Sequence, residues 1–220
     1  IEIFKKIIKI ILVSKEIFFH RISYYPKSVT AFENNFALYI GKKFGLTFCN
    51  GTSSIEAALF ALGVGEGDEV LVPSCTFHAS IDPIVNLGAT PIFVDVEVNS
   101  FIISLDDLVD KITKKTKCIV VVHPFGYVAD MEKILKISRE YNLVLLEDVS
   151  HAHGAKFAQK MAGSYGDISC FSLQGAKAIA AGEGGIAVTD DKDLYSRMSM
   201  YGHFDRHSDL FTAEYKQYTH

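Results

Sequence analysis

The sequence predicts an α/β fold in which a mostly parallel β-sheet lies between layers of helices. From about residue 50 onward, short apolar segments alternate with segments of helical periodicity. One of the apolar segments, CIVVV at 118–122, has no polar residue at any position, as is typical of a parallel strand buried on both faces. Strands that alternate with helices favour a parallel sheet covered on both sides. We therefore predict the α/β class.

The first half of this alternating region contains two helices and two strands. A helix is predicted from Ser53 to Leu62, because Ser53 and Glu56 match a capping box. A strand at 68–73, a helix near 77–87 and a strand at 90–96 follow. The glycines in GVGEGDE at 63–69 come after a helix and before a strand, which is the reverse of a Rossmann phosphate loop, so they indicate a turn.

The second half continues the alternation. Ser104 and Asp107 predict the start of a helix at 104–112. After the strand at 118–122, a helix near 130–141 leads to a strand at 143–147. Further strands are predicted at 167–172 and 185–189, with GEGG at 182–185 as the turn into the last one.

Residues 1–30 predict an amphipathic helical segment, and residues 31–220 predict one α/β domain. Apolar positions 4, 7, 8 and 11 lie opposite Lys5, Lys6 and Lys9 on a helix. These lysines and Lys15 leave no run near the roughly 20 apolar residues that a membrane span needs. Docking on the chain's own domain or on a partner subunit is expected, with a membrane surface as the alternative. The final AEYKQYTH has no stop signal, so we expect a chain cut from a longer protein.

Charge and cysteine content exclude several classes of function. The net charge of −4 and the lack of a basic stripe argue against a nucleic-acid partner. The cysteines form no CxxC pair and have no metal-ligand spacing, so no metal site is predicted. Because each lies among apolar residues, we expect buried free thiols in a reducing cytoplasm; the four are Cys49, Cys75, Cys118 and Cys170.

Candidate ligand-binding groups fall at strand ends and helix starts, where ligands collect in open α/β sheets. Gly51, Thr52 and Ser53 lie at a predicted helix amino terminus, whose N–H groups and dipole suit a phosphate; a plain helix cap is the alternative. Asp148 follows the apolar strand, and His151 comes three residues later. A carboxylate there can hold a heterocycle's ring nitrogen protonated, or it can simply cap a helix.

Three further positions complete the candidate set. Lys177, in FSLQGAKAIAAGEGG, has small and apolar neighbours and no carboxylate close in sequence, which favours the neutral amine that forms imines; an ordinary surface lysine is the alternative. Ser172 precedes it by five residues. Phe77 follows a strand end and can stack on a planar ring or belong to the core. Glu147 is expected to be structural because it faces away from Asp148, and His123 either borders the site or is structural.

Together these segments resemble the DegT/DnrJ/EryC1/StrS family of pyridoxal-phosphate (PLP)-dependent sugar aminotransferases, a branch of the aspartate-aminotransferase fold. The resemblance is continuous from about residue 32 to 202, and its most specific string is FSLQGAKAIAAGEGGIAVT. The other strings that carry it are NGTSSIEAAL, GVGEGDEVLVPSCTFHAS, GATPIFVDV, HPFGYVADM and LLEDVSHAHGA. The resemblance implies the large domain of fold type I for residues 31–220, without the family's smaller carboxyl-terminal domain.

The resemblance also implies roles for the candidate residues. Lys177 would be the Schiff-base lysine, Asp148 the partner of the pyridine nitrogen, and Phe77 the residue that stacks on the ring. The phosphate would be held by Thr52, Ser53 and Ser172, beside Gly51. His151 stands where many members carry Gln and would contact the phenolic oxygen.

The implied reaction transfers an amino group, with glutamate as the expected donor, to a nucleotide-linked ketosugar. The resemblance further implies a homodimer whose partner subunit completes the site, and the free cysteines favour the cytoplasm. One alternative is a sugar dehydratase of the same family, but those members carry His in place of the lysine at 177. The other alternative is a non-catalytic regulator with this fold.

Overall fold

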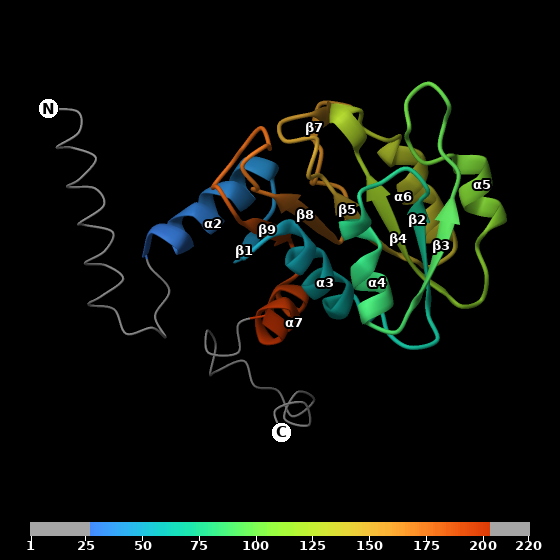
Figure 1. Ribbon diagram of the computed structural model, residues 1–220, viewed down its shortest axis with the longest axis horizontal. Helices are drawn as coiled ribbons and strands as arrows, with labels where there is room; N and C mark the ends of the chain where they lie inside the picture. Colours follow the sequence, from blue (N-terminus) through green and yellow to red (C-terminus); the bar gives the residue numbers. More distant parts are fainter. Residues whose placement is uncertain (1–26, 203–220) are drawn as a thin grey trace, which may run out of the picture.

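The computed structural model describes residues 27–202 (Figure 1). Its α-helices and strands, in chain order, are α2 (Lys27–Ile40), β1 (Phe44–Phe48), α3 (Gly51–Ala61), β2 (Glu69–Pro73), α4 (Asp82–Asn86), β3 (Thr90–Val94), α5 (Leu105–Asp110), β4 (Thr116–Val122), α6 (Met131–Glu140), β5 (Val144–Asp148), β6 (Lys156–Phe157), β7 (Lys160–Met161), β8 (Ile168–Ser172), β9 (Gly185–Thr189) and α7 (Lys192–Gly202). Two 3-10 turns, His78–Ser80 and Pro124–Gly126, lie before α4 and after β4.

Seven strands form the central sheet in the order β1-β9-β8-β5-β4-β2-β3. The pairs from β8 to β3 are parallel, whereas β9 is antiparallel to both of its neighbours. The predicted mostly parallel α/β sheet is therefore confirmed, and each predicted strand is present within a few residues. The sequence analysis did not identify β1, in which Gly45 and Thr47 interrupt the apolar pattern.

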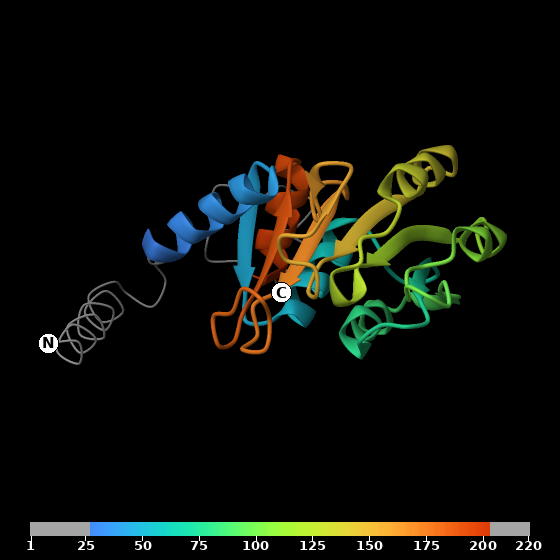
Figure 2. The ribbon, with the colours of Figure 1, turned by 90° about the horizontal axis from the view of Figure 1, so that it is seen from above.

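Helices cover both faces of the sheet (Figures 1 and 2). On one face, side chains of α3, α4 and α7 pack with alternate strand residues such as Val70, Val72 and Val120. On the other face, α5 and α6 cover the half of the sheet with β2, β4 and β5. The rest of that face is covered by α2 and the segment that follows β5. Neighbouring strand residues face opposite layers, as their period of two requires.

The capping box predicted at Ser53 and Glu56 is wrong, whereas the helix predicted to start at Ser104 is present as α5. The N-cap of α3 is Asn50, three residues before the predicted cap, and its side chain accepts the Ser53 N–H at 2.8 Å. At α5, Ser104 precedes the helix but makes no side-chain cap. Asp107 instead accepts the Asp95 N–H at 2.6 Å and pairs with Lys111 at 2.7 Å. A tertiary contact therefore replaces the local one.

The helix predicted near 77–87 is divided into a 3-10 turn (His78–Ser80) and α4. Pro83 lies in the first turn of α4, where its missing N–H costs nothing. A continuous helix through that position would lose a hydrogen bond and clash with the preceding turn. The division turns Phe77, His78 and Thr76 toward the carboxyl end of the sheet, where they are partly or fully exposed.

The cysteine prediction is half right. All four thiols are free, and Cys118 and Cys170 are buried in the sheet. Cys49 is exposed and Cys75 is partly exposed, because both lie beyond strand ends rather than within them.

The predicted segment 1–30 lies almost wholly outside the described residues. Helix α2 starts at Lys27 and continues across the predicted boundary at residue 30. Within residues 27–202, no helix has the length and apolar character required to cross a bilayer.

Candidate active site

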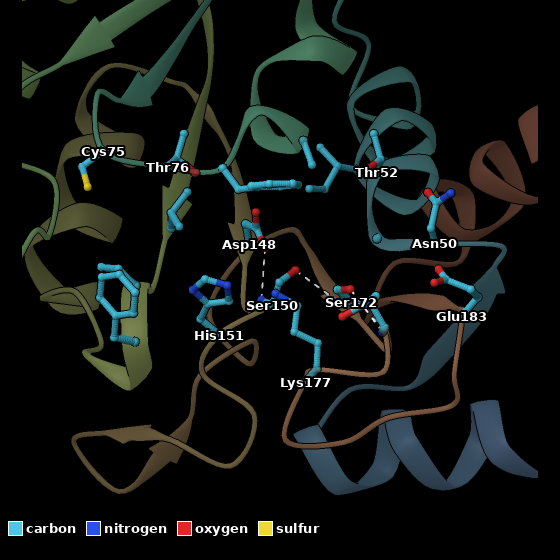
Figure 3. Close-up of a pocket in the computed structure, with 18 residues that line it drawn as sticks. Asn50, Thr52, Cys75, Thr76, Asp148, Ser150, His151, Ser172, Lys177 and Glu183 are labelled. Carbon is cyan, nitrogen blue, oxygen red and sulfur yellow. Dashed lines mark hydrogen bonds between the residues drawn. The ribbon is translucent and has the colours of Figure 1, made fainter.

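A pocket of about 650 Å³ opens at the carboxyl ends of β4, β5 and β8, beside the amino terminus of α3 (Figure 3). This is the edge at which ligands bind in open α/β sheets. Of the predicted site residues, seven line the pocket: Gly51, Thr52, Phe77, Asp148, His151, Ser172 and Lys177. The eighth, Ser53, does not line it. The fold thus brings together residues separated by more than 120 positions in the chain.

The first turn of α3 forms one wall of the pocket. The backbone N–H groups of Gly51 and Thr52 come too early in the helix to have an intrahelical acceptor. Gly51 is packed so closely that an added Cβ would lie 2.9 Å from the Cβ of Ser172. A Cβ on Gly185 would lie 2.2 Å from the Asn50 carbonyl oxygen. The two glycines therefore bring the helix amino terminus directly against the ends of β8 and β9.

Ser53 serves the cap of this helix. Its backbone N–H and its hydroxyl both donate to Asn50 Oδ1, each at 2.8 Å. The Cys49 thiol lies 3.1 Å from the same hydroxyl. Asn50, which lines the pocket, had no role in the sequence analysis. An asparagine immediately before the helix-forming run was the available signal.

Asp148, the last residue of β5, is only 6% exposed. The Ser80 hydroxyl donates to its Oδ2 at 2.7 Å, and the Ser150 N–H donates to its Oδ1 at 3.1 Å. These bonds fix the plane of the carboxylate at the pocket wall. Ser80 arrives from the turn before α4, 68 residues away, and no local sequence pattern marks it.

Lys177 lies on the loop between β8 and β9. The loop is closed by a bridge between Gln174 and Gly182 and by the bond from the Ala181 N–H to the Leu173 carbonyl. Figure 3 shows the lysine side chain extending toward Ser150 and Asp148. Among the described residues, the Lys177 amine makes no ion pair within 4.0 Å and is the one lysine or arginine that lines this pocket.

Aromatic rings form another wall of the pocket, to which Phe77, Phe125 and His151 contribute. Phe77 is 65% exposed, and its ring is presented to the pocket. His151 lies 5.7 Å from the ring of Phe125, centroid to centroid. Partial burial and the positive charge of Lys177 lower the pKa of His151, and the opposing effect of the Asp148 carboxylate is smaller. His151 is therefore a neutral hydrogen-bonding group at neutral pH.

Glu147 lies behind this wall and is fully buried. It accepts hydrogen bonds from the Ser169 hydroxyl and from the backbone N–H groups of Gly163, Tyr165 and Gly166. His123 Nε2 lies 3.1 Å from the same carboxylate. The structural role predicted for Glu147 is confirmed. Of the two alternatives for His123, the structural one is correct, since its side chain is buried and does not line the pocket.

The Glu147 pKa lies below its ordinary value. Burial acts to raise it, but the hydrogen bond and charge of His123, together with the N–H groups of Gly166 and Gly163, outweigh that effect. Within residues 27–202, no group of three or more His, Cys, Asp or Glu side chains is arranged to hold a metal ion.

Comparison with known proteins places this geometry in a defined class. The aminotransferase from Psychrobacter cryohalolentis superimposes with a TM-score of 0.82 at 37% identity, over 88% of this chain and 50% of that one. The PLP form of the putative sugar aminotransferase Spr1654 from Streptococcus pneumoniae superimposes with a TM-score of 0.77 at 27% identity, over 86% of this chain and 54% of that one. The fold is that of the large domain of PLP-dependent enzymes of fold type I.

Sequence comparison narrows the class to a family. GDP-perosamine synthase from Escherichia coli O157:H7 is 46% identical over 169 residues, which are 77% of this chain and 46% of that protein. A sequence model of the DegT/DnrJ/EryC1/StrS aminotransferase family matches residues 19–219. The chain belongs to this family. It spans about half the length of the curated relatives that it matches.

Proposed function

We propose that this chain carries the cofactor-binding part of a PLP-dependent aminotransferase that acts on a nucleotide-linked ketosugar. One observation supports this proposal above the others: an amine without an ion-pair partner, on Lys177, and a buried carboxylate, on Asp148, face the same pocket (Figure 3). Family membership and the names of the relatives agree with it. No observation favours the dehydratase or the non-catalytic regulator.

The residues of the pocket fit PLP. The free N–H groups of Gly51 and Thr52 and the hydroxyls of Thr52 and Ser172 suit its phosphate. Asp148 suits its ring nitrogen, and Phe77 suits one face of its ring. We propose that His151, which also lines the pocket, would hydrogen-bond the phenolic oxygen. Ser53 acts indirectly, since it orients Asn50 at the helix cap.

Lys177 Nζ would hold the cofactor and, with a substrate bound, would act as the general base and acid. Its Nζ removes the proton from the α-carbon of the donor and later delivers a proton to the corresponding carbon of the acceptor. When bound, PLP supplies the conjugated ring that accepts the electron pair left by the broken C–H bond. Asp148, held by Ser80 and Ser150, would keep the ring nitrogen of the bound cofactor protonated.

The substrates are proposed in part from the name of a relative. One relative is named for a GDP-linked amino sugar, so we propose a nucleotide-linked ketosugar as the acceptor. Glutamate is the proposed amino donor. We further propose that residues 31–220 are the PLP-binding large domain, that residues 1–30 are an amphipathic helical segment, and that the protein is a cytoplasmic homodimer.

The test is a donor half-reaction followed by an acceptor screen with the full-length protein and PLP. Glutamate should be converted to 2-oxoglutarate in stoichiometric amount without any acceptor. Adding GDP-, UDP- or dTDP-linked ketosugars in turn should then give catalytic turnover with at least one of them. No 2-oxoglutarate from glutamate, and no keto acid from glutamine as the comparison donor, would refute the proposed function.

A further inference from the structure

Three neighbouring rings form a row at the pocket, of which His151 and Phe125 line it and Phe101 lies beside Phe125. The Phe125 ring lies 5.7 Å from the His151 ring, and 6.3 Å from the Phe101 ring in an edge-to-face arrangement. We call Phe101, Phe125 and His151 the aromatic row. Its members come from three loops, after β3, β4 and β5, at the carboxyl edge of the sheet. Only tertiary structure brings them together.

The row is not explained by core packing. Phe125 is 69% exposed and Phe101 is 46% exposed, and neither belongs to the hydrophobic clusters that cover the sheet. Both residues have left-handed backbone conformations, with φ of 53° at Phe125 and 58° at Phe101. This conformation is unfavourable for a bulky side chain, and residues held in it cluster at active sites and ligand contacts. An exposed, strained pair of aromatic residues at a pocket mouth therefore indicates a ligand contact.

The loops that carry these rings are held firmly. For Phe125, His123 lies before the turn, and its Nδ1 accepts the Ala129 N–H from beyond it at 3.3 Å. Nε2 of the same imidazole then donates to buried Glu147. For Phe101, the bridge between Val96 and Ile103 closes the loop, and the Phe101 N–H donates to the Glu97 carbonyl at 2.9 Å. Both rings are thus presented on preorganised turns, which lowers the entropic cost of binding.

The direction of the row identifies what it can bind. Its His151 end lines the pocket together with Lys177 and Asp148, the residues proposed to carry the reaction. Phe125 also lines the pocket, whereas Phe101, the next ring of the row, does not, so the row leads from the pocket to its outside. A nucleotide-linked sugar is elongated, with the sugar at the reacting end and a planar base at the other. Aromatic side chains bind bases by stacking and tolerate differences in base identity.

We propose that Phe125, supported by Phe101, is a specificity-determining residue that stacks on the nucleobase of the acceptor. This inference rests on the proposed function and adds a subsite to it. The His123–Glu147 pair then acts as a positioning element, because it holds the turn that carries the Phe125 ring.

Binding of nucleotides without the sugar tests this subsite separately from catalysis. GDP, UDP and dTDP are titrated calorimetrically into the full-length protein, with pyrophosphate as the probe that lacks a base. Phe125→Ala should weaken the tightest of the three nucleotides about tenfold, the loss expected for one base–aromatic contact. Phe125→Tyr should retain affinity, and pyrophosphate affinity should not change. Phe93→Ala, at a residue 47% exposed but outside the pocket, is the matched control and should bind all probes normally.

Several outcomes would overturn the subsite. These are unchanged nucleotide affinity in Phe125→Ala, an equal loss of pyrophosphate affinity, or no measurable binding of any of the three nucleotides to the unmodified protein. If Phe125→Ala instead dissociates subunits in sedimentation with nucleotide affinity intact, the row is a subunit contact. Should that variant fail to fold, Phe125→Leu replaces it, since it keeps bulk and removes the aromatic face. The donor half-reaction of the unmodified protein is scored independently, so failure of the proposed function is recognised separately.

Discussion

Lys177 lies on a loop whose two ends are hydrogen-bonded to each other, so the position of its backbone at the pocket is fixed. We predict that borohydride reduction of the full-length protein with bound PLP fixes the cofactor to Lys177 Nζ. Peptide mapping by mass spectrometry locates the adduct. Lys177→Ala should lose both the adduct and the visible absorption. Lys160→Ala, at a surface lysine outside the pocket, is the control and should retain both. An adduct on any other lysine would contradict the assignment.

Asp148 is held by two hydrogen bonds that Asn cannot reproduce without presenting an amide to one of the two donors. We predict that Asp148→Asn folds normally and loses roughly 100- to 1000-fold in kcat, because the ring nitrogen is no longer held protonated. Turnover kinetics and the near-ultraviolet circular dichroism of bound PLP provide the measurements.

Asp110→Asn is the matched control for that substitution, at an exposed position in α5 remote from the pocket. It should have normal kinetics. Near-normal turnover of Asp148→Asn would remove this carboxylate from the mechanism.

At the scale of elements, β5 carries both a pocket residue, Asp148, and a buried polar hub, by which we mean Glu147 with its hydrogen-bond partners His123 and the segment 163–166. Adjacent residues of this strand face opposite layers, so Asp148 faces the pocket while Glu147 holds the segment 163–166 and His123. His123 also donates its backbone N–H to the Asp148 carbonyl at 3.2 Å. The hub thus positions the strand end that carries Asp148 and the turn that carries Phe125.

We predict that Glu147→Gln lowers the free energy of unfolding by on the order of 3 kcal/mol at neutral pH, because buried N–H groups lose a charged acceptor. Denaturant titrations with linear extrapolation measure this change. Glu140→Gln, at an exposed residue that ends α6, should have no measurable effect. An equal and small effect of both substitutions would show that the hub contributes little.

The same variant tests a pH dependence. The pKa of Glu147 is lowered in the folded protein, so its stabilising contribution is complete above the unfolded value of about 4.3 and is lost as the pH falls through the lowered pKa. Unfolding titrations of both proteins from pH 7 to 3 measure the effect. The difference between wild type and Glu147→Gln should be constant down to about pH 4.5 and shrink below it. A difference that does not change with pH would contradict ionisation of Glu147 as its cause.

At the scale of the whole molecule, the pocket has a wall of exposed aromatic rings, with Phe77 and Phe125 more than half exposed. The chain also spans about half the length of its curated relatives. We therefore predict that residues 1–220 alone bind PLP weakly and turn over little substrate. A water-accessible site that cannot position the sugar is expected to lose about 100-fold or more.

A comparison of two proteins tests this expectation. The 220-residue chain is compared with the same chain joined to the carboxyl-terminal half of GDP-perosamine synthase from Escherichia coli O157:H7, the 46% identical relative. Light scattering should find a dimer for the longer protein, and fluorescence titration should find tighter PLP binding by it. Equal kcat/KM for the two proteins would show that the site is self-contained.

Local sequence was enough to predict the α/β class, the strands of the parallel region and eight site residues, seven of which line the pocket. These features are encoded locally, in apolar runs of strand length and in polar or glycine residues where those runs end. The family strings added expected roles, which a short segment such as FSLQGAKAIAAGEGG carries without reference to the rest of the chain.

Tertiary structure alone decided the caps, the partners of Asp148 and the aromatic row. Asn50, and not Ser53, caps α3. Asp107 accepts a hydrogen bond from the Asp95 N–H and does not cap its own helix, because contacts across the fold compete with local ones. Ser80 reaches Asp148 over 68 residues of chain. The hydrophobic periodicity of the sequence cannot predict this pairing, because it depends on which strand ends become neighbours in the sheet.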